Sequence, residues 1–381
     1  MKHIALAMGL SDYYDHGIAR GIVRYAKTKP GWRLYGHGWM FSPLDDLRGW
    51  DGDGVIARIE YAETATLLEG VTCPVVDVAN AFSAPHIHLV SNDDAETGRL
   101  AGRHFRKNGF KSVAYCGVSH AQWSLRRLQG FTESLGSDDV PIFERPLSWW
   151  LQERHSVELA LFLARLPKPV ALFACNDKVG LRVSSICSAE QIAVPDQVAV
   201  LGVDNEDIPC ELANPTLSSI ELQLEQIGER AAATLHLLME HPERAVPNVL
   251  VPPVDVVERR STLAYASANP LIVEAYRRIR SDGGHVKSVK DVADEVAVSR
   301  RTLENHFKRE TGQTVHEAII AQKIRIATHL LRSTDLKMEA IAGEAGFGSL
   351  QRFFAHFKRY TGTTPNRFRK LTGSTPRKPR V

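Results

Sequence analysis

The stretch MEAIAGEAGFGSLQRFFAHFKRYTGTTPNRF, Met338–Phe368, decides the fold of the last third of this 381-residue chain. Its first helix carries apolar residues on one face: Ile341, Ala342 and Ala345. Gly346–Phe347–Gly348 then breaks the helical period and permits a sharp turn, because glycine tolerates positive φ. Ser349 is an N-cap for a second helix with an apolar stripe: Phe353, Phe354 and Phe357. Polar and basic residues lie opposite that stripe, so the pattern predicts a helix-turn-helix whose second helix suits the major groove of DNA.

The same unit occurs about fifty residues upstream. Its first helix carries an apolar set: Val289, Val292, Ala293 and Val296. A turn at Ala297–Ser299 leads into a second helix, Arg300–Glu310, which ends at Gly312. Both second helices run into matching tails, NHFKRETGQT from Asn305 and AHFKRYTGTT from Ala355. A long apolar-faced helix, roughly 315–333, lies between them, and the sequence therefore predicts two helix-turn-helix units joined by one rigid helix.

The pattern I-A-x-x-x-G-F-x-S-x-x-x-F-x-x-x-F-K-x-x-x-G-x-T-P-x-x-x-R, from Ile341 to Arg369, resembles the AraC-type DNA-binding domain. The resemblance covers about 110 residues and implies double-stranded DNA as a partner. It places base-reading positions on both second helices: Arg301, Glu304, Asn305, Gln351, Arg352 and Ala355. Further DNA-binding candidates are basic: Arg300, and at the helix ends, where they would bind phosphate, Lys308, Lys358 and Arg359.

The chemistry of these side chains suits base recognition, because Arg pairs bidentately with guanine and Asn or Gln with adenine. Ala355 departs from the AraC pattern and would read by apolar contact alone. Two alternatives stay open: Arg300 and Arg301 belong to a solvated face, or Glu304 pairs with Lys308 four residues on. The two units would enter successive major grooves roughly 34 Å apart. The family further implies a homodimer on operator half-sites, and RNA polymerase as a partner if the chain is an activator.

Residues 1 to about 258 alternate short apolar runs with helical periods. The predicted strands are His3–Met8, Trp32–Tyr35, Gly54–Ile59, Val75–Val78, Ser112–Cys116, Ile142–Phe143, Ala171–Cys175 and Val198–Val203. The predicted helices are Ile18–Lys27, Glu96–Asn108, Arg127–Leu135, Val157–Arg165, Lys178–Ala189 and Leu224–Met239. This alternation predicts an α/β fold of two lobes, each with a parallel sheet covered on both faces, and a ligand cleft at the carboxyl ends of the strands.

Several stretches of this region resemble the ligand-binding core of LacI-type repressors, which has the periplasmic-binding-protein fold: DGVIAR from Asp53, SNDDAETGRLAGRHF from Ser91, RRLQGF from Arg126, ALFACNDKVGLRV from Ala171 and VAVLGVDNED from Val198. LacI-type proteins begin with a DNA-binding headpiece, whereas this sequence begins directly at its first strand. Together with a C-terminal AraC-type domain, the order resembles a family of bacterial sugar-operon activators. That resemblance implies a sugar effector, and D-xylose is the sugar that we expect first.

The ligand-site candidates are Asp15, Trp123, Arg127, Asn176 and Asp204. The LacI resemblance implies Arg127, Asn176 and Asp204, and the resemblance to the sugar-operon activators implies Asp15 and Trp123. A carboxylate can accept from two adjacent hydroxyls, an amide can donate and accept, and an arginine can donate in a fork. Simpler alternatives stay open: a turn at Asp204, a helix cap at Asn176, plain packing of Trp123 and a surface ion pair of Arg127.

Composition limits the function classes. Residues 267–381 hold 22 Lys and Arg against 11 Asp and Glu, whereas residues 1–266 hold 25 against 33, so only the C-terminal module is expected to meet a polyanion. Five scattered cysteines without C-x-x-C spacing, and no apolar stretch near the ~20 residues of a membrane span, indicate a protein of the reducing cytoplasm. The phosphate-loop, dinucleotide, nucleophile-elbow and zinc-protease motifs do not occur, so we expect neither an enzyme nor a cofactor nor a metal.

We therefore expect a sensing domain over 1–258, a linker over 259–270, a DNA-binding domain over 271–371 and a disordered basic tail over 372–381. The function expected is a ligand-responsive transcription regulator that activates sugar genes when sugar closes the cleft. The alternatives left open are the same architecture with another sugar or small polar effector, or a repressor.

Overall fold

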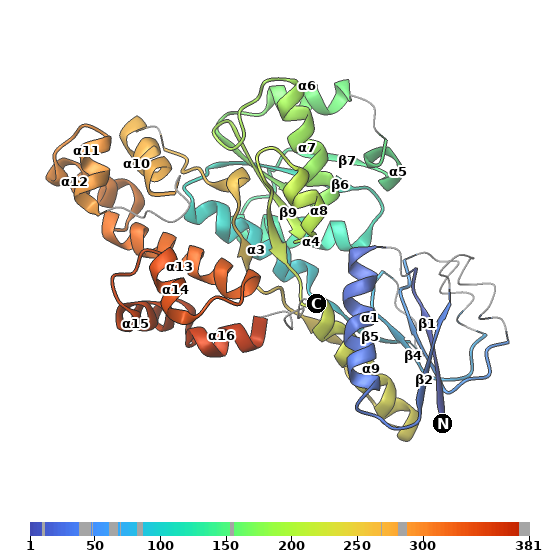
Figure 1. The fold of residues 1–381 in the computed structure, drawn as a ribbon. Coiled ribbons are helices and arrows are strands. Elements are labelled where there is room, and N and C mark those ends of the chain that lie inside the picture. Colours follow the sequence, from blue (N-terminus) through green and yellow to red (C-terminus); the bar gives the residue numbers. More distant parts are fainter. Residues whose placement is uncertain are drawn as a thin grey trace. The chain divides into compact units, whose positions relative to one another are not determined.

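The computed structural model describes residues 1–9, 12–37, 47, 49–60, 68, 70–81, 87–152, 156–267, 269–280 and 288–372. The chain forms two compact units (Figure 1). The first comprises Met1–Lys107 and Lys111–Thr262, and the second comprises Asn108–Phe110 and Leu263–Val381. The basic tail expected over 372–381 lies outside the described residues except for Thr372, which ends the last helix.

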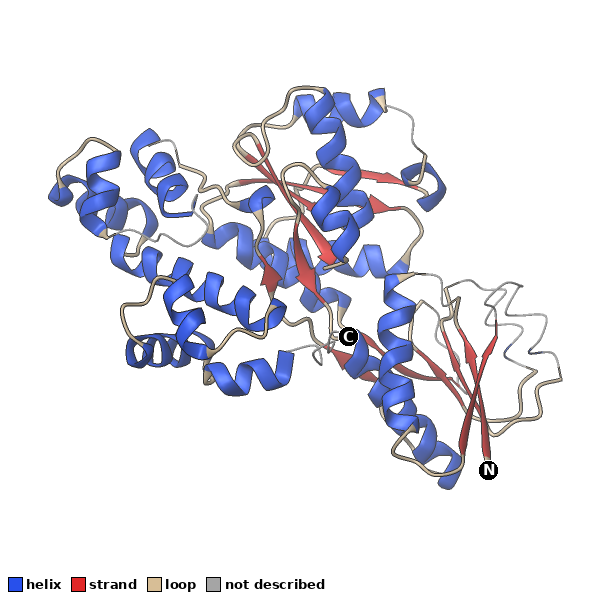
Figure 2. Ribbon diagram, in the orientation of Figure 1, coloured by secondary structure: helices blue, strands red, loops and turns tan. Residues whose placement is uncertain are grey.

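The first unit contains two sheets (Figure 2). One sheet is parallel throughout, in the order β11 (Val249–Val251), β5 (Ile87–Asn92), β4 (Val75–Asp77), β3 (Gly54–Ala57), β1 (Lys2–Ala7), β2 (Trp32–His37). The other has the order β12 (Val256–Val257), β10 (Ser218–Glu221), β9 (Val198–Asp204), β8 (Val170–Ala174), β6 (Ser112–Val118), β7 (Ile142–Arg145). It is parallel except for the edge pair β10 and β12. The chain passes between the sheets after β5, after β10 and after β11. The predicted two-lobed α/β fold is thus confirmed.

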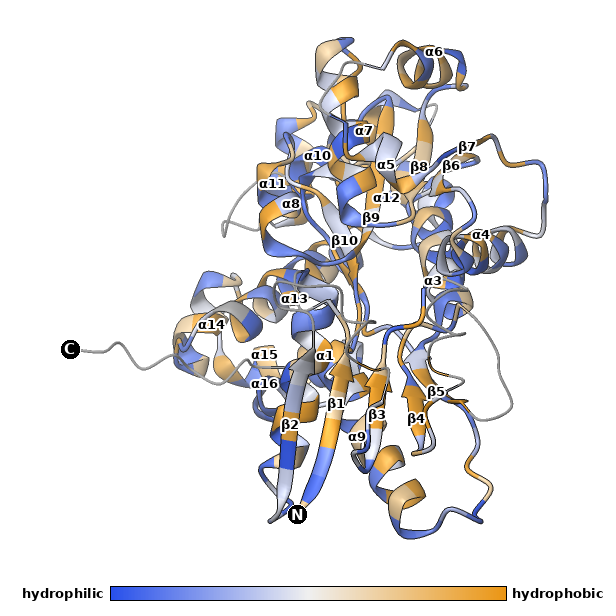
Figure 3. Ribbon diagram, turned by 90° about the vertical axis from the view of Figure 1, so that its right-hand side faces the viewer, coloured by the Kyte–Doolittle hydropathy of each residue, from blue (hydrophilic) through white to orange (hydrophobic). Residues whose placement is uncertain are grey.

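Helices cover both faces of these sheets, which is why central strands such as β3 and β8 are continuously apolar and buried. The helices of the first unit are α1 (Tyr13–Ala26), α3 (Asp94–Lys107), α4 (Gln122–Leu135), α5 (Leu147–Trp150), α6 (Val157–Arg165), α7 (Asp177–Ala189), α8 (Asp207–Leu212) and α9 (Leu224–Glu240). In Figure 3 the strands β3 and β4 have hydrophobic colours, and every residue of both is buried. Helix α1 packs against α9, and α3 packs against α4.

Two glycines allow the close approach of α3 and α4. A Cβ atom at Gly98 would collide with the backbone oxygen of Arg127, and one at Gly130 would collide with that of Ala95. The contact fixes the start of α3 beside the first turns of α4, and it thereby sets the position of the Arg127 side chain.

The predicted strands and helices of this unit are all present, with ends shifted by a few residues. Four strands were not predicted: β5, β10, β11 and β12. The sequence of β10, SSIE, looks like a loop, yet its two serines are buried. Ser218 Oγ donates to the carbonyl of Arg259 (2.9 Å) and Ser219 Oγ donates to Asp177 (2.5 Å), so hydrogen bonds satisfy a polar strand inside the protein.

The second unit is helical, with α10 (Pro270–Arg280), α11 (Val289–Glu295), α12 (Arg300–Thr311), α13 (Val315–Ser333), α14 (Met338–Glu344), α15 (Leu350–Thr361) and α16 (Pro365–Thr372). It has two apolar cores, one around Phe307 and one around Phe353 and Phe357. Helix α13 contributes Ile319 to the first core and Ile324 to the second. The two helix-turn-helix units therefore share one helix, with the bounds that the sequence predicted.

The segment expected as a linker, 259–270, divides between the units at Thr262–Leu263. On the first side, a short 3-10 helix (Arg260–Thr262) is tied to the second sheet, because Ser261 Oγ donates to the carbonyl of Val200 (2.6 Å). On the second side, Tyr265 stacks on Tyr276 of α10 with ring centroids 4.3 Å apart. Ser261 and Tyr265 thus each pack against the unit to which they belong.

Candidate functional site

The second sheet has a topological switch point, because the chain leaves β6 for β7 on one side and returns to β8 on the other. Ligands of such sheets bind in the crevice outside the carboxyl ends of the strands at this point, here those of β6 and β8. Arg127 lies on α4, which follows β6, and Asn176 follows β8. Asp204 is the last residue of the neighbouring strand β9. The topology brings together the three candidates that the LacI resemblance implied.

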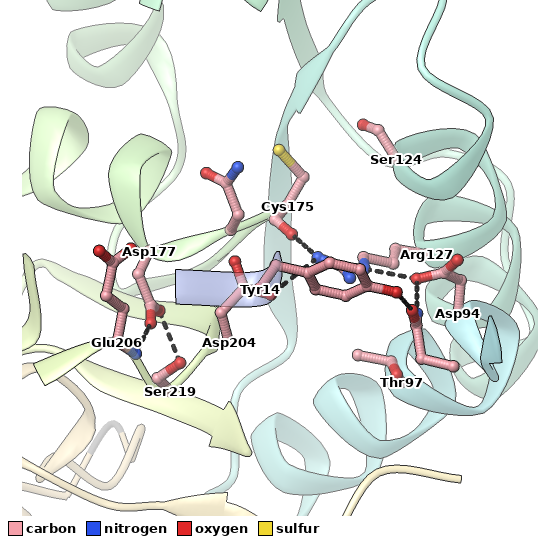
Figure 4. Close-up of polar contacts among 12 residues, drawn as sticks. Tyr14, Asp94, Thr97, Ser124, Arg127, Cys175, Asp177, Asp204, Glu206 and Ser219 are labelled. Atoms are coloured by element: carbon pink, nitrogen blue, oxygen red, sulfur yellow. Dashed lines mark hydrogen bonds and ion pairs between the residues drawn. The ribbon is translucent and has the colours of Figure 1, made fainter. Parts of the chain in front are cut away.

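Arg127 is the centre of this crevice (Figure 4). Its side chain is 4% exposed, its Nε donates to Asp94 Oδ1 (2.8 Å), and one Nη donates to the carbonyl of Cys175 (2.5 Å). The same Nη lies 3.9 Å from Asp204 Oδ1, and the guanidinium lies 5.1 Å from the ring centroid of Trp123. A surface ion pair is therefore excluded for Arg127, and Trp123 is half-buried against it.

Asp204, the last residue of β9, and Asn205, which follows it, both have positive φ, 108° and 54°. Such backbone is strained for residues with a side chain and persists only where neighbours hold it. Here Asn205 N donates to Ser219 Oγ (2.9 Å), Ser219 Oγ donates to Asp177 Oδ1 (2.5 Å), and Glu206 N donates to Asp177 Oδ2 (2.8 Å). These contacts hold the backbone after β9 in place, with the Asp204 carboxylate next to Arg127.

Burial raises the pKa of two neighbouring carboxyl groups, those of Asp204 and Asp177. Desolvation raises the pKa of Asp204 to about 7, and the positive charge of Arg127 opposes that rise. Burial also raises the pKa of Asp177 well above its ordinary value, with the nearby charge of Asp204 as the next cause. Asp204 thus titrates close to neutral pH.

Asn176 is the N-cap of α7, because its Oδ1 accepts from Val179 N (2.9 Å). The helix-cap alternative therefore accounts for the amide oxygen. In the part of the chain that the structure describes, the amide Nδ2 of Asn176 has no hydrogen-bond partner. Capping orients this residue at the crevice and leaves a donor for a ligand.

Asp94 begins α3 beneath Arg127, and it was not predicted as a site residue. It is 2% exposed, and its Oδ1 accepts from both Arg127 and Asn92. Its Oδ2 is buried and has no hydrogen-bond partner among the described residues. Burial raises the pKa of Asp94, and Arg127 opposes this. The sequence contained one hint, because Asp94 belongs to the stretch from Ser91 that resembles the LacI-type ligand-binding core.

Asp15 lies in the first lobe, in the first turn of α1. Its side chain is 2% exposed, and its Oδ1 accepts from Arg58 (2.9 Å). Asp15 thus pairs with Arg58, which was not predicted as a site residue. Arg58 directly follows β3, and its place at the carboxyl end of a predicted strand was the available hint.

The two recognition helices, α12 and α15, have the same pattern of exposure. The predicted base-reading and phosphate-binding side chains are exposed on both helices, apart from Glu304, which is half-buried: Arg300, Arg301, Asn305, Lys308, Gln351, Arg352, Ala355, Lys358 and Arg359. Glu304 pairs with Arg300 through two contacts of 3.1 Å, and not with Lys308 as the alternative had it.

Caps define both recognition helices. Ser299 and Ser349 accept from the backbone at the N-termini, and Gly312 and Gly362 end the helices in the left-handed conformation. On α13, Lys323 Nζ donates to the carbonyl of Gly346 in the second turn (2.6 Å). The caps define the ends of each recognition helix, and the Lys323 contact ties the turn of the second unit to the shared helix.

Among the described residues, no helix is long and apolar enough to cross a membrane, and no group of three or more His, Cys, Asp and Glu could hold a metal ion.

Three family models match the chain: an XylR N-terminal domain over residues 3–95, a periplasmic binding protein-like domain over 103–262 and a helix-turn-helix domain over 292–371. The chain is 30% identical to the xylose operon regulatory protein of Escherichia coli strain K12 over 382 residues, covering 97% of each chain. It is 29% identical to the protein of that name from Haemophilus influenzae, covering 96% of this chain and 97% of the relative. It also resembles the solved structure of the xylose-binding transcription activator XylR, with 29% identity, a TM-score of 0.64 and coverage of 98% and 99%.

Proposed function

This chain belongs to the family of the xylose operon regulatory proteins, and from that premise we propose that it senses D-xylose in the first unit and binds operator DNA through the second. The observation that carries the proposal is the convergence of Arg127, Asn176 and Asp204 on one crevice of a two-lobed α/β unit.

The crevice has the chemistry of a sugar site. Asp204 offers a carboxylate that accepts from two adjacent hydroxyls, and Arg127 and Asn176 offer donors. The half-buried ring of Trp123 offers an apolar face for the C–H side of a pyranose. Because Arg127 is already fixed by Asp94 and Cys175, little side-chain freedom is lost when a ligand binds.

The second unit supplies the DNA reader. In this proposal α12 and α15 enter successive major grooves, with Arg301, Asn305 and Arg352 at base edges and Lys308 and Lys358 on phosphates. Arg300 orients Glu304 through their ion pair. A homodimer then occupies two operator half-sites in the cytoplasm and acts as an activator through contact with RNA polymerase.

Sugar binding controls DNA binding through the lobes. The proposed ligand stabilises one arrangement of the two lobes, and that arrangement favours the orientation of the DNA reader that fits the operator. A coupling free energy of about 1–3 kcal/mol would change operator affinity by about 5–150-fold. The proposed role is regulatory, without catalysis.

Calorimetric titration of the full-length protein with D-xylose, L-arabinose, D-ribose and D-glucose tests the effector. We expect binding of D-xylose that is lost in Asp204→Ala. Binding of another of these sugars in place of D-xylose would support the same architecture with a different effector. Absence of heat with all four would contradict the proposed sensing function.

A further inference from the structure

The chain enters the second unit at two separate places. One is Leu263, within the segment that the sequence predicted as a linker. The other is the short segment Asn108–Phe110, which also belongs to the second unit although the residues on both sides of it belong to the first. This segment directly follows α3, whose last residue is Lys107. Helix α3 therefore runs by an unbroken backbone from the first unit into the second.

The other end of α3 lies in the proposed sugar site. Asp94 is the first residue of this helix, and its Oδ1 accepts from Arg127 Nε (2.8 Å). The helix has 14 residues and therefore spans about 20 Å. It packs closely on α4, because a Cβ atom at Gly98 would collide with the backbone oxygen of Arg127. Close-packed helices transmit a displacement, so a shift of Asp94 is carried along α3 to Lys107.

Asn108 is bound firmly within the second unit. It is 3% exposed, its Oδ1 accepts from an Nη of Arg280 (2.8 Å), and its carbonyl accepts from Ala266 N (3.0 Å). The other Nη of Arg280 donates to the carbonyl of Ala264 (3.1 Å). Hydrogen bonds from a charged donor are roughly twice as strong as neutral ones. Arg280, the last residue of α10, thus joins Asn108 to the start of the second unit.

The backbone next to Asn108 is equally constrained. Gly109 has a φ of 78°, which favours glycine. A Cβ atom at this position would lie 2.8 Å from the carbonyl oxygen of Ala266 and 2.9 Å from a ring atom of Tyr265. Both the backbone and the side chain of this segment therefore follow the position of Tyr265 and Ala266.

A stack of buried rings leads from Arg280 to the first recognition helix. The Arg280 guanidinium lies 4.9 Å from the ring centroid of Tyr276. Tyr276 stacks on Tyr265, with centroids 4.3 Å apart, and on Phe307 of α12, with centroids 4.8 Å apart. Tyr276 and Phe307 are 2% and 0% exposed. Because a packed core does not deform smoothly, a displacement of Asn108 reaches α12 through these rings.

We propose that Asn108 and Arg280 are positioning residues that carry the sugar response from α3 to the recognition helix α12. The proposal rests on the sugar-sensing function proposed above. Sugar displaces Asp94 through Arg127, α3 displaces Asn108, and Arg280 with its ring stack changes the orientation of α12. Neither Asn108 nor Arg280 touches sugar or DNA in this proposal. A response that passed through Thr262–Leu263 alone would not need the bond between them.

The test uses full-length protein and substitutions on both sides of this bond. Asn108→Ala, Arg280→Ala and the double variant remove it, and Asn108→Asp keeps an acceptor for Arg280. The matched control is Arg277→Ala, because Arg277 carries the same charge on the same helix but pairs with Glu274 (2.9 Å). Calorimetry gives the affinity for D-xylose without DNA. Fluorescence anisotropy gives the affinity, with and without D-xylose, for an operator that the wild type selects from random-sequence DNA.

The readout is the ratio of the operator affinities with and without D-xylose. We expect this ratio, about 5–150-fold in the wild type, to fall below about twofold in the two single alanine variants. The double variant should lose no more than either single one, because all three lack the same bond. All variants should keep the wild-type affinity for D-xylose. Asn108→Asp and Arg277→Ala should also keep the wild-type ratio.

Three outcomes would contradict the proposal. A wild-type ratio in Asn108→Ala and Arg280→Ala would overturn the inference and leave sugar sensing standing. Alanine variants that also lose affinity for D-xylose would overturn it too, since the bond would then be merely structural. A wild type that binds no D-xylose, or whose operator affinity ignores it, would overturn both the inference and the proposed function.

A second measurement needs no substitution and stays decisive if the alanine variants fold poorly. Hydrogen exchange of the wild-type protein, without DNA, follows the Ala266 amide, which donates to the carbonyl of Asn108. D-xylose should shift the exchange rate of this amide. An exchange rate that D-xylose leaves unchanged would overturn the inference.

Discussion

The pKa of Asp204, raised by burial to about 7, predicts that sugar binding depends on pH in the neutral range. Asp204 accepts hydrogen bonds from ligand hydroxyls only when ionised, because a protonated carboxyl replaces one acceptor with a donor. At a pH below its pKa, Asp204 must therefore lose a proton before the sugar binds. The affinity for the sugar falls as the pH falls through 7. Above that value the carboxylate is already ionised and affinity levels off.

The size of the effect follows from the fraction of Asp204 that is ionised. With a pKa near 7, this fraction falls from about nine tenths at pH 8 to about one tenth at pH 6. The dissociation constant for D-xylose should thus rise about tenfold between pH 8 and pH 6. Calorimetric titrations in buffers of matched ionic strength measure this ratio, and buffers of different ionisation enthalpy measure the proton released on binding near pH 6.

The matched control is Asp204→Asn, which keeps the shape of the side chain and removes its titration. Weak residual binding by this variant should show no tenfold change between pH 8 and pH 6. A dissociation constant of the wild type that stays constant over this range would refute the reasoning, since it would mean that Asp204 is ionised throughout or does not contact the ligand.

Four further substitutions test the structure. Ser219→Ala removes a donor from the buried Asp177 carboxylate, so we expect the free energy of unfolding measured in urea to fall by about 1–3 kcal/mol and sugar binding to weaken; unchanged stability would contradict the assigned hydrogen bonds. Ala297 has a φ of 54°, and Ala297→Gly should raise the stability of the DNA-binding unit by about 0.5 kcal/mol, as relief of strain exceeds the entropic cost of glycine. Arg352→Ala should relax the base preference at one operator position. Lys358→Ala should weaken the affinity for all DNA sequences alike and reduce the slope of log affinity against log salt concentration by about 1. Identical behaviour of the two variants would reject the assignment of Arg352 to a base.

The DNA-binding unit was predictable because its determinants are local. Ser349 and Gly362 mark the ends of α15, and the bounds of α13 follow from its apolar period and from the capping box of Thr314 and Glu317. Each of these features lies within a few residues of the helix end that it defines. The exposed positions of the recognition helices follow from the same period.

The site in the first unit was predictable in part. Arg127, Asn176 and Asp204 were selected by resemblance, and the structure brings them to one crevice. Arg58 was missed because its importance depends on β1 and β3 being neighbours at a switch point, which is a long-range property of the sheet. For the same reason the sequence could not show that Asp15 is buried and paired with Arg58.

Sugar bound by the first unit should change the affinity of the second unit for DNA, and one measurement tests this coupling most directly. Fluorescence anisotropy would give the affinity of the full-length protein for an operator, selected by that protein from random-sequence DNA, with and without D-xylose. The same titrations would be made with Asp204→Ala. We predict that D-xylose tightens operator binding by about 5–150-fold in the wild type and has no effect on the variant. Operator affinity that ignores D-xylose in the wild type, or that still responds to it in a variant that no longer binds the sugar, would contradict the account.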